Sequence, residues 1–412
     1  MVPTLAQLEW LASPEGCQVC SEMAADRPAD TPKTIEQWRQ RLEPEQVSTA
    51  WSQVLLRSSA KSKFSRAEQM LLDRVGMEQS SDEVVATHKA KRFAGFASIT
   101  DLCCGIGGDS LALAAQASVT AVDLNGPRVM MAEHNARVYG HRITGVIADV
   151  TFTQPDAAAA HIDPDRRPTG RRSHQIDQGS PDLPVLEAIV RRYQNVAIKL
   201  SPGVDFSRLP FEAEVELISH RGQCKQAVVW TGQLRERGET EVTNCKIAST
   251  KPLPRWRATV LPGGESISAA TDDELRWPES RPITPDGYLL EPDAAVIRAH
   301  LVGPLARLLE CHVIDPRIAW LIADRPIASP FVDVFQVIDV VPFSEKKLRP
   351  WLNGHDIGSV DIKTRGSAVS PDDILRRLRL SGRRHGILFI TRLGNRPTAI
   401  LAQRHNNTAG PI

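Results

Sequence analysis

The 412-residue sequence contains no uninterrupted apolar run near the roughly 20 residues that a membrane-spanning helix needs, so we expect no membrane partner. The first ten residues lack the basic segment and apolar core of a signal peptide. Seven cysteines, an odd number without a regular spacing, argue against a disulfide framework. The cysteine usage predicts a protein of the reducing cytoplasm. The length, with 42% hydrophobic and 24% charged residues, predicts a soluble globular chain of two or three domains.

Residues that bind metals are also scarce. Cys17 and Cys20 form the one cysteine pair with the spacing of a metal or redox site. A structural zinc site needs about four ligands, and the sequence has neither a second Cys-x-x-Cys pair nor a His-x-x-x-His pair. We therefore expect no bound metal.

The formal net charge is only +1, so the chain as a whole does not predict a polyanionic partner. The charge is uneven, however, because residues 340–412 hold 13 lysines and arginines against five acids. This local excess of +8 favours a phosphate-binding surface in the C-terminal part. A solvated face, or packing against the more acidic remainder of the chain, would explain it as well.

The most informative stretch is a glycine-rich turn between a predicted strand and a predicted helix. A β-prone run ends at Asp101, and Gly105, Gly107 and Gly108 follow before a run of good helix formers. Such a turn lets a ligand lie against bare backbone at the start of a helix. Taken alone, it is compatible with a dinucleotide site, an adenosyl-methionine site or merely a tight turn.

Acidic residues end four successive predicted strands. After the strand that precedes the glycine turn, further strands are predicted over residues 119–123, 143–148 and 157–162. The carboxyl ends of parallel strands meet at one edge of a sheet, so all four acids would face one crevice. The second acid lies roughly 20 residues after the turn, where a ribose-binding carboxylate is expected. These acids are Asp101, Asp123, Asp149 and Asp163.

Three segments carry a family resemblance: Asp-Leu-Cys-Cys-Gly-Ile-Gly-Gly-Asp at 101–109, Ala-Val-Asp at 121–123, and Asn-Ala-Arg-Val-Tyr-Gly at 135–140. With these segments the chain resembles the class I S-adenosylmethionine-dependent methyltransferases, and among them the trimethylguanosine synthase-like branch. In its order of parts it is also similar to bacterial methyltransferases with a C-terminal THUMP-like domain. The resemblance implies S-adenosyl-L-methionine as the cofactor and structured RNA, such as tRNA or rRNA, as the partner.

The predicted fold class is α/β, a class I (Rossmann-like) methyltransferase sheet that ends in an antiparallel hairpin. The hairpin is predicted over residues 214–219 and 227–230, and an all-parallel dinucleotide-binding sheet would lack it. The strand and helix patterns after residue 330 follow the order β-α-β-α-β-β of a small α+β domain. The predicted parts are a helical segment over 1–96, the methyltransferase domain over 97–262, a linker and helical connector over 263–329 with one helix over 294–309, and the THUMP-like domain over 330–412.

Asp163-Pro164-Asp165-Arg166 stands where methyltransferases of amino groups carry Asn/Asp/Ser-Pro-Pro followed by an aromatic residue. In that motif the first side chain and the carbonyl after it accept the two N–H bonds of a weakly nucleophilic amine. Here Asp165 replaces the second proline and Arg166 replaces the aromatic residue. An arginine can stack on a base, and Asp165 could instead be a general base. The motif alone leaves open whether the acceptor is an exocyclic amine.

The resemblance assigns roles to individual residues. Asp101, Gly105 and Gly107 would hold the methionine part of the cofactor, Asp123 its ribose and Asp149 its adenine amine. The cofactor set is completed by Cys103, Asp109, Leu124, Val150 and Asp163. The catalytic set is Asp163, Pro164, Asp165 and Arg166. The substrate set is Arg167, Arg171, Arg172, Lys199, Lys363 and Arg365. An ordinary charged loop is an equal alternative for the arginines after Pro164, as is a structural partner of an acid for Lys199.

The first hundred residues predict helices, and by resemblance they would form a lid on the catalytic domain. For the basic run that contains Lys89, Lys91 and Arg92, we favour a solvated face over an RNA contact. Two other functions stay open. One is a methyltransferase of small molecules or proteins, whose basic domain docks a partner. The other is a non-catalytic RNA-binding protein that retains a cofactor pocket.

Overall fold

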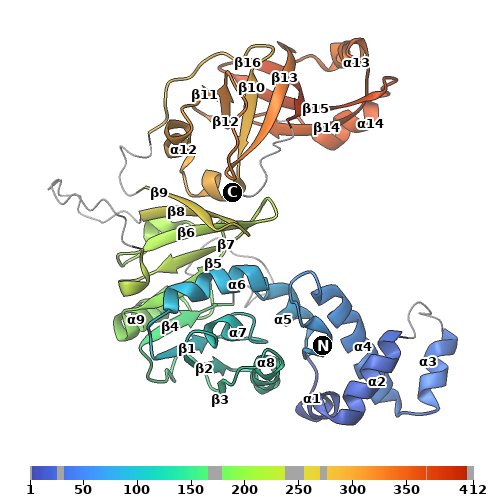
Figure 1. The fold of residues 1–412 in the computed structure, drawn as a ribbon, viewed down its shortest axis with the longest axis vertical. Helices are drawn as coiled ribbons and strands as arrows, with labels where there is room; N and C mark the ends of the chain where they lie inside the picture. Colours follow the sequence, from blue (N-terminus) through green and yellow to red (C-terminus); the bar gives the residue numbers. More distant parts are fainter. Residues whose placement is uncertain are drawn as a thin grey trace. The chain divides into compact units, whose positions relative to one another are not determined.

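The computed structural model describes residues 2–25, 32–165, 179–236, 255–269, 276–367 and 369–405. The chain groups into two compact units (Figure 1). The first unit comprises Met1–Glu214 and Gln226–Pro252, and the second comprises Val215–Lys225 and Leu253–Ile412. The four-part division predicted above, with boundaries at residues 96, 262 and 329, stays a prediction.

The N-terminal part is helical, as predicted. The hydroxyl of Thr4 accepts a hydrogen bond from the Gln7 amide at 3.3 Å, and the Gln7 side chain accepts one from the Thr4 amide at 2.8 Å, which forms a capping box. Pro44 begins α4, at a position where its missing amide hydrogen removes no helical bond. The helices are α1 (Leu5–Ala12), α2 (Pro14–Ala25), α3 (Pro32–Arg39), α4 (Pro44–Ala60), α5 (Arg74–Gln79) and α6 (Glu83–Ala90).

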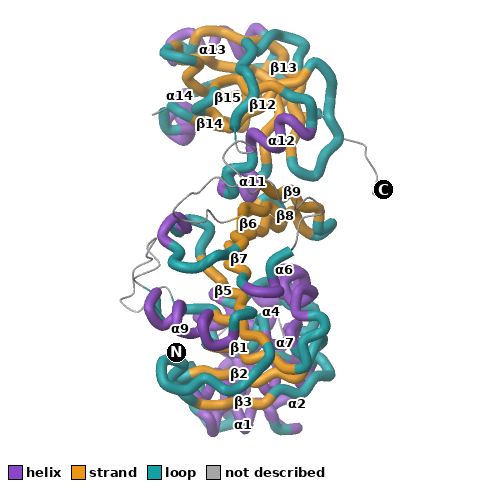
Figure 2. The backbone as a smooth tube through the Cα atoms, turned by 90° about the vertical axis from the view of Figure 1, so that its left-hand side faces the viewer, coloured by secondary structure: helices purple, strands orange, loops and turns teal. Residues whose placement is uncertain are grey.

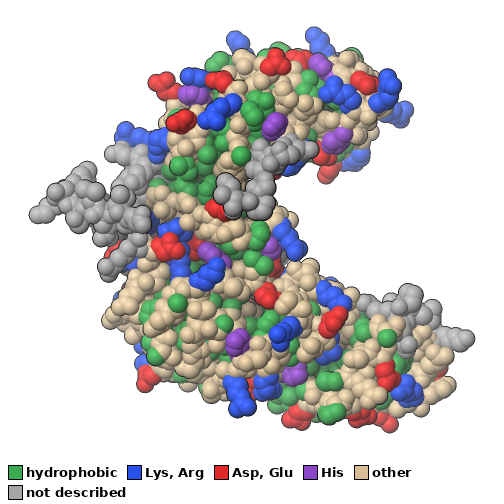
Figure 3. All heavy atoms as spheres, viewed as in Figure 1, with side chains coloured by type: hydrophobic (Ala, Val, Ile, Leu, Met, Phe, Trp, Pro, Cys, Tyr) green, Lys and Arg blue, Asp and Glu red, His purple; other side chains and the backbone are tan. Residues whose placement is uncertain are grey.

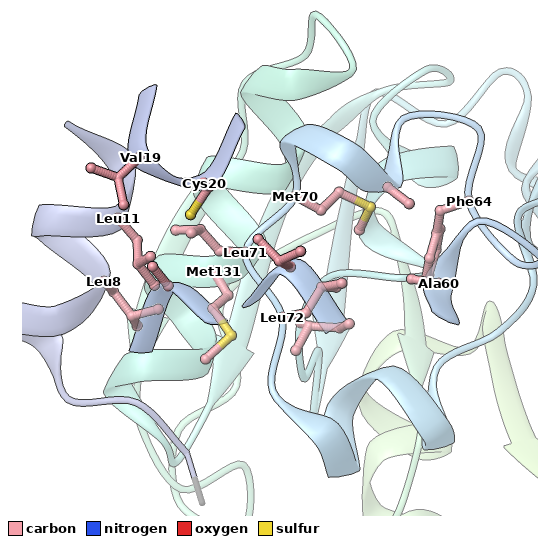
Figure 4. Packing of buried hydrophobic residues seen from close by; sticks show 14 of the residues in the cluster. Leu8, Leu11, Val19, Cys20, Ala60, Phe64, Met70, Leu71, Leu72 and Met131 are labelled. Carbon is pink, nitrogen blue, oxygen red and sulfur yellow. The ribbon is translucent and has the colours of Figure 1, made fainter. Parts of the chain in front are cut away.

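These helices share an apolar core with the part of the first unit that contains the glycine turn. Leu8 and Leu11 of α1 are buried together with Met131, which belongs to α8 (Gly126–Val138). Figure 4 shows these side chains, with Cys20 and Leu71 beside them. The N-terminal helices are therefore part of the core of the first unit.

The side chain of Asn135 on α8 ties the segment before α5 to the glycine turn. Its Oδ1 accepts a hydrogen bond from the Leu71 amide at 2.8 Å, and its Nδ2 donates to the carbonyls of Leu71 at 3.0 Å and Ile106 at 2.9 Å. Asn135 is fully buried. One amide thus satisfies backbone groups of the N-terminal segment and of the turn at the same time.

We expect Asn135→Ala to lower the free energy of unfolding by about 2–4 kcal/mol, because it leaves three buried backbone groups without partners. Arg137→Ala, at an exposed position of the same helix, should change it by less than about 0.5 kcal/mol. Urea unfolding followed by tryptophan fluorescence measures both values. If the two variants lost the same stability, Asn135 would not be the anchor described here.

The first sheet contains the strands that the sequence predicts. Its order is β3-β2-β1-β4-β5-β7-β6-β8-β9 within the described residues. The strands from β3 to β5 are parallel, whereas residues 227–230 of β7 lie antiparallel to residues 197–200 of β5. Figure 2 shows β3, β2, β1, β5 and β7 in orange, in this order from the bottom. This topology confirms the predicted methyltransferase fold class. The strands are β1 (Ser98–Leu102), β2 (Ser118–Asp123), β3 (Thr144–Ile147), β4 (Ala159–Ile162), β5 (Val196–Leu200), β6 (Glu214–His220), β7 (Gln223–Trp230), β8 (Arg255–Leu261) and β9 (Glu265–Ala269).

Helices connect β1 to β2, β2 to β3 and β4 to β5, whereas a loop without a helix connects β3 to β4. The short α7 (Ser110–Leu113) follows the glycine turn. The side chain of Asn125 caps α8 by accepting a bond from the Arg128 amide at 3.1 Å. Asp182 caps α9 (Leu183–Tyr193) in the same way, at 3.3 Å from the Val185 amide. The carboxyl ends of β1 to β5 therefore open into loops at one edge, where the candidate site lies.

The second unit contains a seven-stranded sheet in the order β11-β12-β10-β13-β16-β15-β14. From residue 332 its elements follow the predicted order β-α-β-α-β-β. No strand is predicted in residues 263–329, yet β9 to β12 lie there and three of them join this sheet. Its elements are β10 (Tyr288–Pro292), α11 (Ala294–Arg298), α12 (Val302–Leu308), β11 (His312–Asp315), β12 (Ile318–Ala323), β13 (Val332–Pro342), α13 (Glu345–Gly354), β14 (Ile357–Arg365), α14 (Pro371–Arg377), β15 (Arg384–Leu393) and β16 (Arg396–Arg404).

The single helix predicted over residues 294–309 is wrong, because the segment divides into α11 and α12. Pro304 explains the break. In one continuous helix its ring would clash with the carbonyl of His300, four residues earlier, and its missing amide hydrogen would remove a helical bond. The chain instead turns at His300, whose φ is 59°.

The predicted substrate residues Lys363 and Arg365 connect the edge strand β14 to β10 and β12, which are not its neighbours in the sheet. Both residues lie on β14, and both pair with Glu291 of β10. Arg365 also donates to the Ala319 carbonyl of β12. Burial lowers the pKa of Arg365, and the Glu291 charge offsets part of that effect. Both cations are thus partners of an acid of the same unit, and their contact with a substrate phosphate stays a prediction.

Candidate functional site

The glycine turn after β1 has the backbone that its sequence suggests. Gly105 and Gly107 have φ values of 56° and 86°, in the left-handed region where glycine is favoured. A Cβ on Gly107 would lie 3.0 Å from two atoms of Ala132, so α8 packs directly on the turn. A Cβ on Gly105 would meet no atom within 4 Å. One side of the turn is therefore packed and the other is open, which fits a flat nucleoside placed against the backbone.

The charges of the four predicted strand-end acids all act on Cys103. This residue follows β1 with a φ of 60°. Burial raises the pKa of the Cys103 thiol well above its usual value, and the charges of Asp123, Asp163, Asp101 and Asp149 raise it further. Each of the four carboxylates is thus close enough to act on one sulfur atom. The raised pKa keeps Cys103 a thiol, which is consistent with packing rather than nucleophilic attack.

Two of these acids bond to backbone amides and stay partly exposed. The Asp123 carboxylate accepts hydrogen bonds from the amides of Gly105 and Asn125, both at 2.9 Å. Asp149 accepts one from the Thr151 amide at 2.8 Å. Carboxylate oxygens have room for further bonds, so both residues can still accept a hydroxyl or an amine. Asp123 also locks the glycine turn to the end of β2.

Apolar side chains stand beside these two acids. Leu124, after Asp123, is 72% exposed, and Phe152, shortly after Asp149, is 86% exposed. Both side chains are therefore accessible to a ligand that lies against the two acids. Val150, predicted with the cofactor set, is instead buried. The loops after the carboxyl ends of β2 and β3 therefore offer apolar surface next to hydrogen-bond acceptors. This combination is suited to an adenine ring.

Asp101 belongs to a row of polar side chains on one face of the sheet. The register pairs Asp101 with His161 and His161 with Ala197, so Lys199, two residues further on, lies on the same face. His161 Nδ1 lies 2.7 Å from Asp101 Oδ1, and the Ser110 hydroxyl bonds to Oδ2. Asp101 is only 1% exposed. Through Ser110, the first residue of α7, Asp101 fixes the helix that follows the glycine turn. Its direct contact with the cofactor stays a prediction.

Lys89 of α6 and Asp109 form a buried ion pair over this row. Lys89 Nζ lies 2.6 Å from Asp109 Oδ1 and 3.4 Å from His161 Nε2, while the Ser81 hydroxyl donates to Asp109 Oδ2 at 2.9 Å. Burial alone would raise the pKa of Asp109, but Lys89, His161 and Lys199 outweigh it and hold the pKa well below its usual value. Asp109 is thus an ionised, buried side chain, and its predicted contact with the cofactor is untested.

The basic run before β1 is therefore not the solvated face that we favoured. Lys89 is 2% exposed, and the side chain of Arg92 is 7% exposed and lies 2.9 Å from Glu214. The Arg92 guanidinium also stacks over the Trp230 ring at 4.3 Å from its centroid. Only Lys91 of the three is exposed. Both buried cations have partners far along the chain, which explains why the local pattern misled.

The acceptor motif follows β4. Asp163 is partly exposed and its Oδ2 lies 2.6 Å from Lys199 Nζ, whereas Pro164 is buried and Asp165 is exposed. Asp165 and Ser180 exchange backbone hydrogen bonds, both at 2.8 Å, which brings the chain back to the motif. The predicted residues Arg166, Arg167, Arg171 and Arg172 lie outside the described part of the chain. Lys199, predicted to bind substrate, is buried as the partner of an acid, the alternative role considered for it.

Four residues of the site were not among the predicted site residues. They are His161, Ser110, Phe152 and Lys89, the last of which was expected on a solvated face. His161 and Lys199 interrupt otherwise apolar parallel strands, where a charged or titratable side chain needs a partner. His161 lies two residues before Asp163, and Lys199 is the penultimate residue of its strand. Because alternate residues of a strand share a face, these positions would have placed both side chains on the face of Asp101. Lys89 gave no such signal, because its partner Asp109 comes from a different element.

The described residues contain no group of three or more His, Cys, Asp or Glu side chains arranged to hold a metal ion. They also include no helix with the length and apolar character that crossing a membrane requires. Cys17 and Cys20 lie on α2, exposed and buried respectively, and both are free thiols.

The basic side chains of the second unit are interspersed with acids, as the face drawn in Figure 3 shows. Arg376 pairs with Asp373 at 2.6 Å, and Arg377 pairs with Glu345 at 2.6 Å. Arg383 lies 3.8 Å from Asp356. These exposed pairs are weak in water and can exchange partners. The arginines therefore remain able to meet a polyanion.

Comparison with known proteins agrees with this geometry. The family model of RNA cap guanine-N2 methyltransferases matches residues 96–167, and the THUMP domain-like model matches residues 332–404. A domain of unknown function matches residues 4–60. A putative methyltransferase from Porphyromonas gingivalis has the same fold, with a TM-score of 0.75 and 19% identity over 96% of this chain and 99% of that chain.

The strand-end acids and the open glycine turn suit a nucleoside ligand. The antiparallel end of the sheet is the feature expected of a class I methyltransferase and not of an all-parallel dinucleotide-binding fold. In two strains of Mycobacterium tuberculosis, an uncharacterized S-adenosylmethionine-dependent methyltransferase is 35% identical over 333 residues, which cover 79% of this chain and 86% of the relative. The chain belongs to the S-adenosylmethionine-dependent methyltransferases, and its cofactor is S-adenosylmethionine.

Proposed function

We propose that the protein methylates a nitrogen of a base in structured RNA such as tRNA or rRNA, with an exocyclic amine as the favoured acceptor. The observation that carries the proposal is Asp163-Pro164 at the end of β4, within the residues that match the RNA cap guanine-N2 family model. The N2 of guanine is an exocyclic amine. The THUMP domain-like match in the basic C-terminal part supports RNA as the substrate class.

The cofactor would lie on the open side of the glycine turn. Gly105 would face it with bare backbone, Asp123 would accept the ribose hydroxyls and Asp149 would accept the adenine amine. Leu124 and Phe152 would flank the ring, since both are exposed beside these acids. Asp101 and Asp109 are buried at the two ends of the glycine turn, and they would support the cofactor by fixing the position of that turn. Bound there, S-adenosylmethionine supplies an electrophilic methyl group.

The residues at the end of β4 would orient the acceptor. Asp163 and the carbonyl of Pro164 accept the N–H bonds of the amine, which fixes its direction and stabilises the positive charge that develops on nitrogen. Asp165 is exposed beside them and would take the proton that the product nitrogen releases. The transfer is a direct displacement without a covalent enzyme intermediate.

Incubation of the full chain with methyl-labelled S-adenosylmethionine and separate bacterial fractions tests this function. We expect label in total RNA, sensitive to ribonuclease, and binding to tRNA that weakens steeply with salt. Label in the protein or small-molecule fraction instead would favour the other type of methyltransferase. Salt-sensitive RNA binding without any transfer would favour a non-catalytic RNA-binding protein.

A further inference from the structure

Lys199 at the end of β5 carries a buried charge with an unusual set of partners. Its side chain is 4% exposed. Its Nζ lies 2.6 Å from Asp163 Oδ2, 3.2 Å from the Gln79 carbonyl oxygen and 3.9 Å from Asp109 Oδ2. A buried ammonium needs such oxygens in place of its water shell. Its position is therefore fixed by the N-terminal segment, the glycine turn and the acceptor motif together.

Asp163 is held by one oxygen only. Its Oδ2 bonds to Lys199, and its backbone amide donates to the Leu102 carbonyl at 3.2 Å. Its Oδ1 has no hydrogen-bond partner among the described residues. Because the side chain is 26% exposed, a ligand can reach this oxygen. The carboxylate thus has one anchored oxygen and one that is available to a ligand.

We propose that Lys199 is a positioning residue for methyl transfer, which fixes Asp163 so that Oδ1 accepts an N–H of the acceptor base. The inference rests on the proposed function, because it concerns how that function's acceptor is held. A carboxylate free to rotate would present its oxygens in many directions, whereas an anchored one presents a single acceptor. Alignment of this kind is worth a large factor in rate, since small misplacements of reacting groups are costly.

The anchor also links the two halves of the site. Asp109 follows the glycine turn directly, and it is held by Lys89 on one side and faces Lys199 on the other. The acceptor carboxylate and the cofactor turn therefore share one cluster of buried charges. A contact of Lys199 with RNA phosphate would require this cluster to open, so we assign Lys199 to the interior of the site.

A double-mutant cycle on the full chain tests this role, with Lys199→Met, Asp163→Asn and the two combined. We expect Lys199→Met to lower kcat for RNA methylation about 100-fold. The KM for RNA and the affinity for S-adenosylhomocysteine should stay within about threefold. The double variant should be no slower than Asp163→Asn alone, because Lys199 acts through Asp163. Lys199→Arg should restore activity to within about tenfold of wild type.

Additive losses in the double variant would overturn the proposal. So would a Lys199→Met variant with unchanged kcat and a raised, salt-dependent KM for RNA, which is the signature of a phosphate contact. Lys91→Met, two residues after Lys89 and exposed, is the control for the loss of a lysine.

Thermal unfolding provides a readout that needs no activity. Lys199→Met leaves a carboxylate without its buried partner, so its Tm should fall by at least about 5 °C, and the added Asp163→Asn change should recover most of that loss. A Tm of the double variant below that of both single variants would contradict the pairing. If the wild-type chain transfers no methyl group to RNA, the proposed function fails, and this cycle still decides whether Lys199 anchors Asp163.

Discussion

Replacement of Asp123 by alanine should reduce the affinity for S-adenosylhomocysteine at least about 100-fold. The carboxylate has two tasks in this account. It accepts the Gly105 and Asn125 amides, both at 2.9 Å, and it would accept the ribose hydroxyls. Hydrogen bonds to a charged group contribute roughly 1.5–3 kcal/mol each. The loss of two such bonds therefore weakens the affinity by about 3 kcal/mol or more, which is at least about 100-fold.

Isothermal titration calorimetry of the full chain measures this loss. Asp156→Ala is a matched control. Asp156 is fully exposed, and its partner is Arg192, at a distance of 2.6 Å, not a residue of the glycine turn. Its affinity should stay within about twofold of wild type. Asp123→Asn keeps one oxygen acceptor and should lie between wild type and Asp123→Ala. Unchanged affinity in Asp123→Ala would remove the cofactor from this end of β2.

The second large effect concerns stability. We expect Lys89→Met to lower the free energy of unfolding by about 3–5 kcal/mol, because it leaves Asp109 buried without its closest cation, 2.6 Å away. The added change Asp109→Asn should recover part of this loss, since it removes the unpaired charge. Lys91→Met, exposed on the same basic run, should change stability by less than about 0.5 kcal/mol.

The stability difference between wild type and Lys89→Met should depend on pH. The cations around Asp109 hold its pKa in the folded protein below that of the unfolded chain, about 3.9 for a free aspartate. Its contribution is therefore fully present above about pH 4 and is lost as the pH falls towards the folded-state pKa. Urea unfolding at pH 7, 5 and 3 measures the difference. A gap that grows at pH 3 would contradict the ion pair.

The turn, the strand ends and the antiparallel hairpin could be predicted because their signals are local. Gly105 and Gly107 follow a strand directly, and each acid marks the end of a short apolar run. The same holds for the elements after residue 332, whose alternating pattern and turn residues lie side by side in the sequence. Such features need no knowledge of distant partners.

Apart from the helix that Pro304 interrupts, what could not be predicted concerns residues whose partners lie far along the chain. Lys89 and Arg92 read as a solvated face, because Asp109 and Glu214 meet them only in the folded chain. The acid that pairs with Lys363 and Arg365 could not be anticipated either, because Glu291 lies on β10, within the predicted linker. The contact of these two cations with a substrate phosphate stays a prediction. A charged side chain within an apolar strand, as at His161 or Lys199, is the local sign of such a partner.

The central claim is that the crevice at the strand ends delivers a methyl group to a base nitrogen held by Asp163. Single-turnover transfer from labelled S-adenosylmethionine to bacterial RNA, followed by digestion to nucleosides, tests it most directly. The account predicts an N-methylated base with wild type and at least about a 100-fold slower reaction with Asp163→Ala. Label on a ribose oxygen or a base carbon, or an equal rate in the variant, would contradict it.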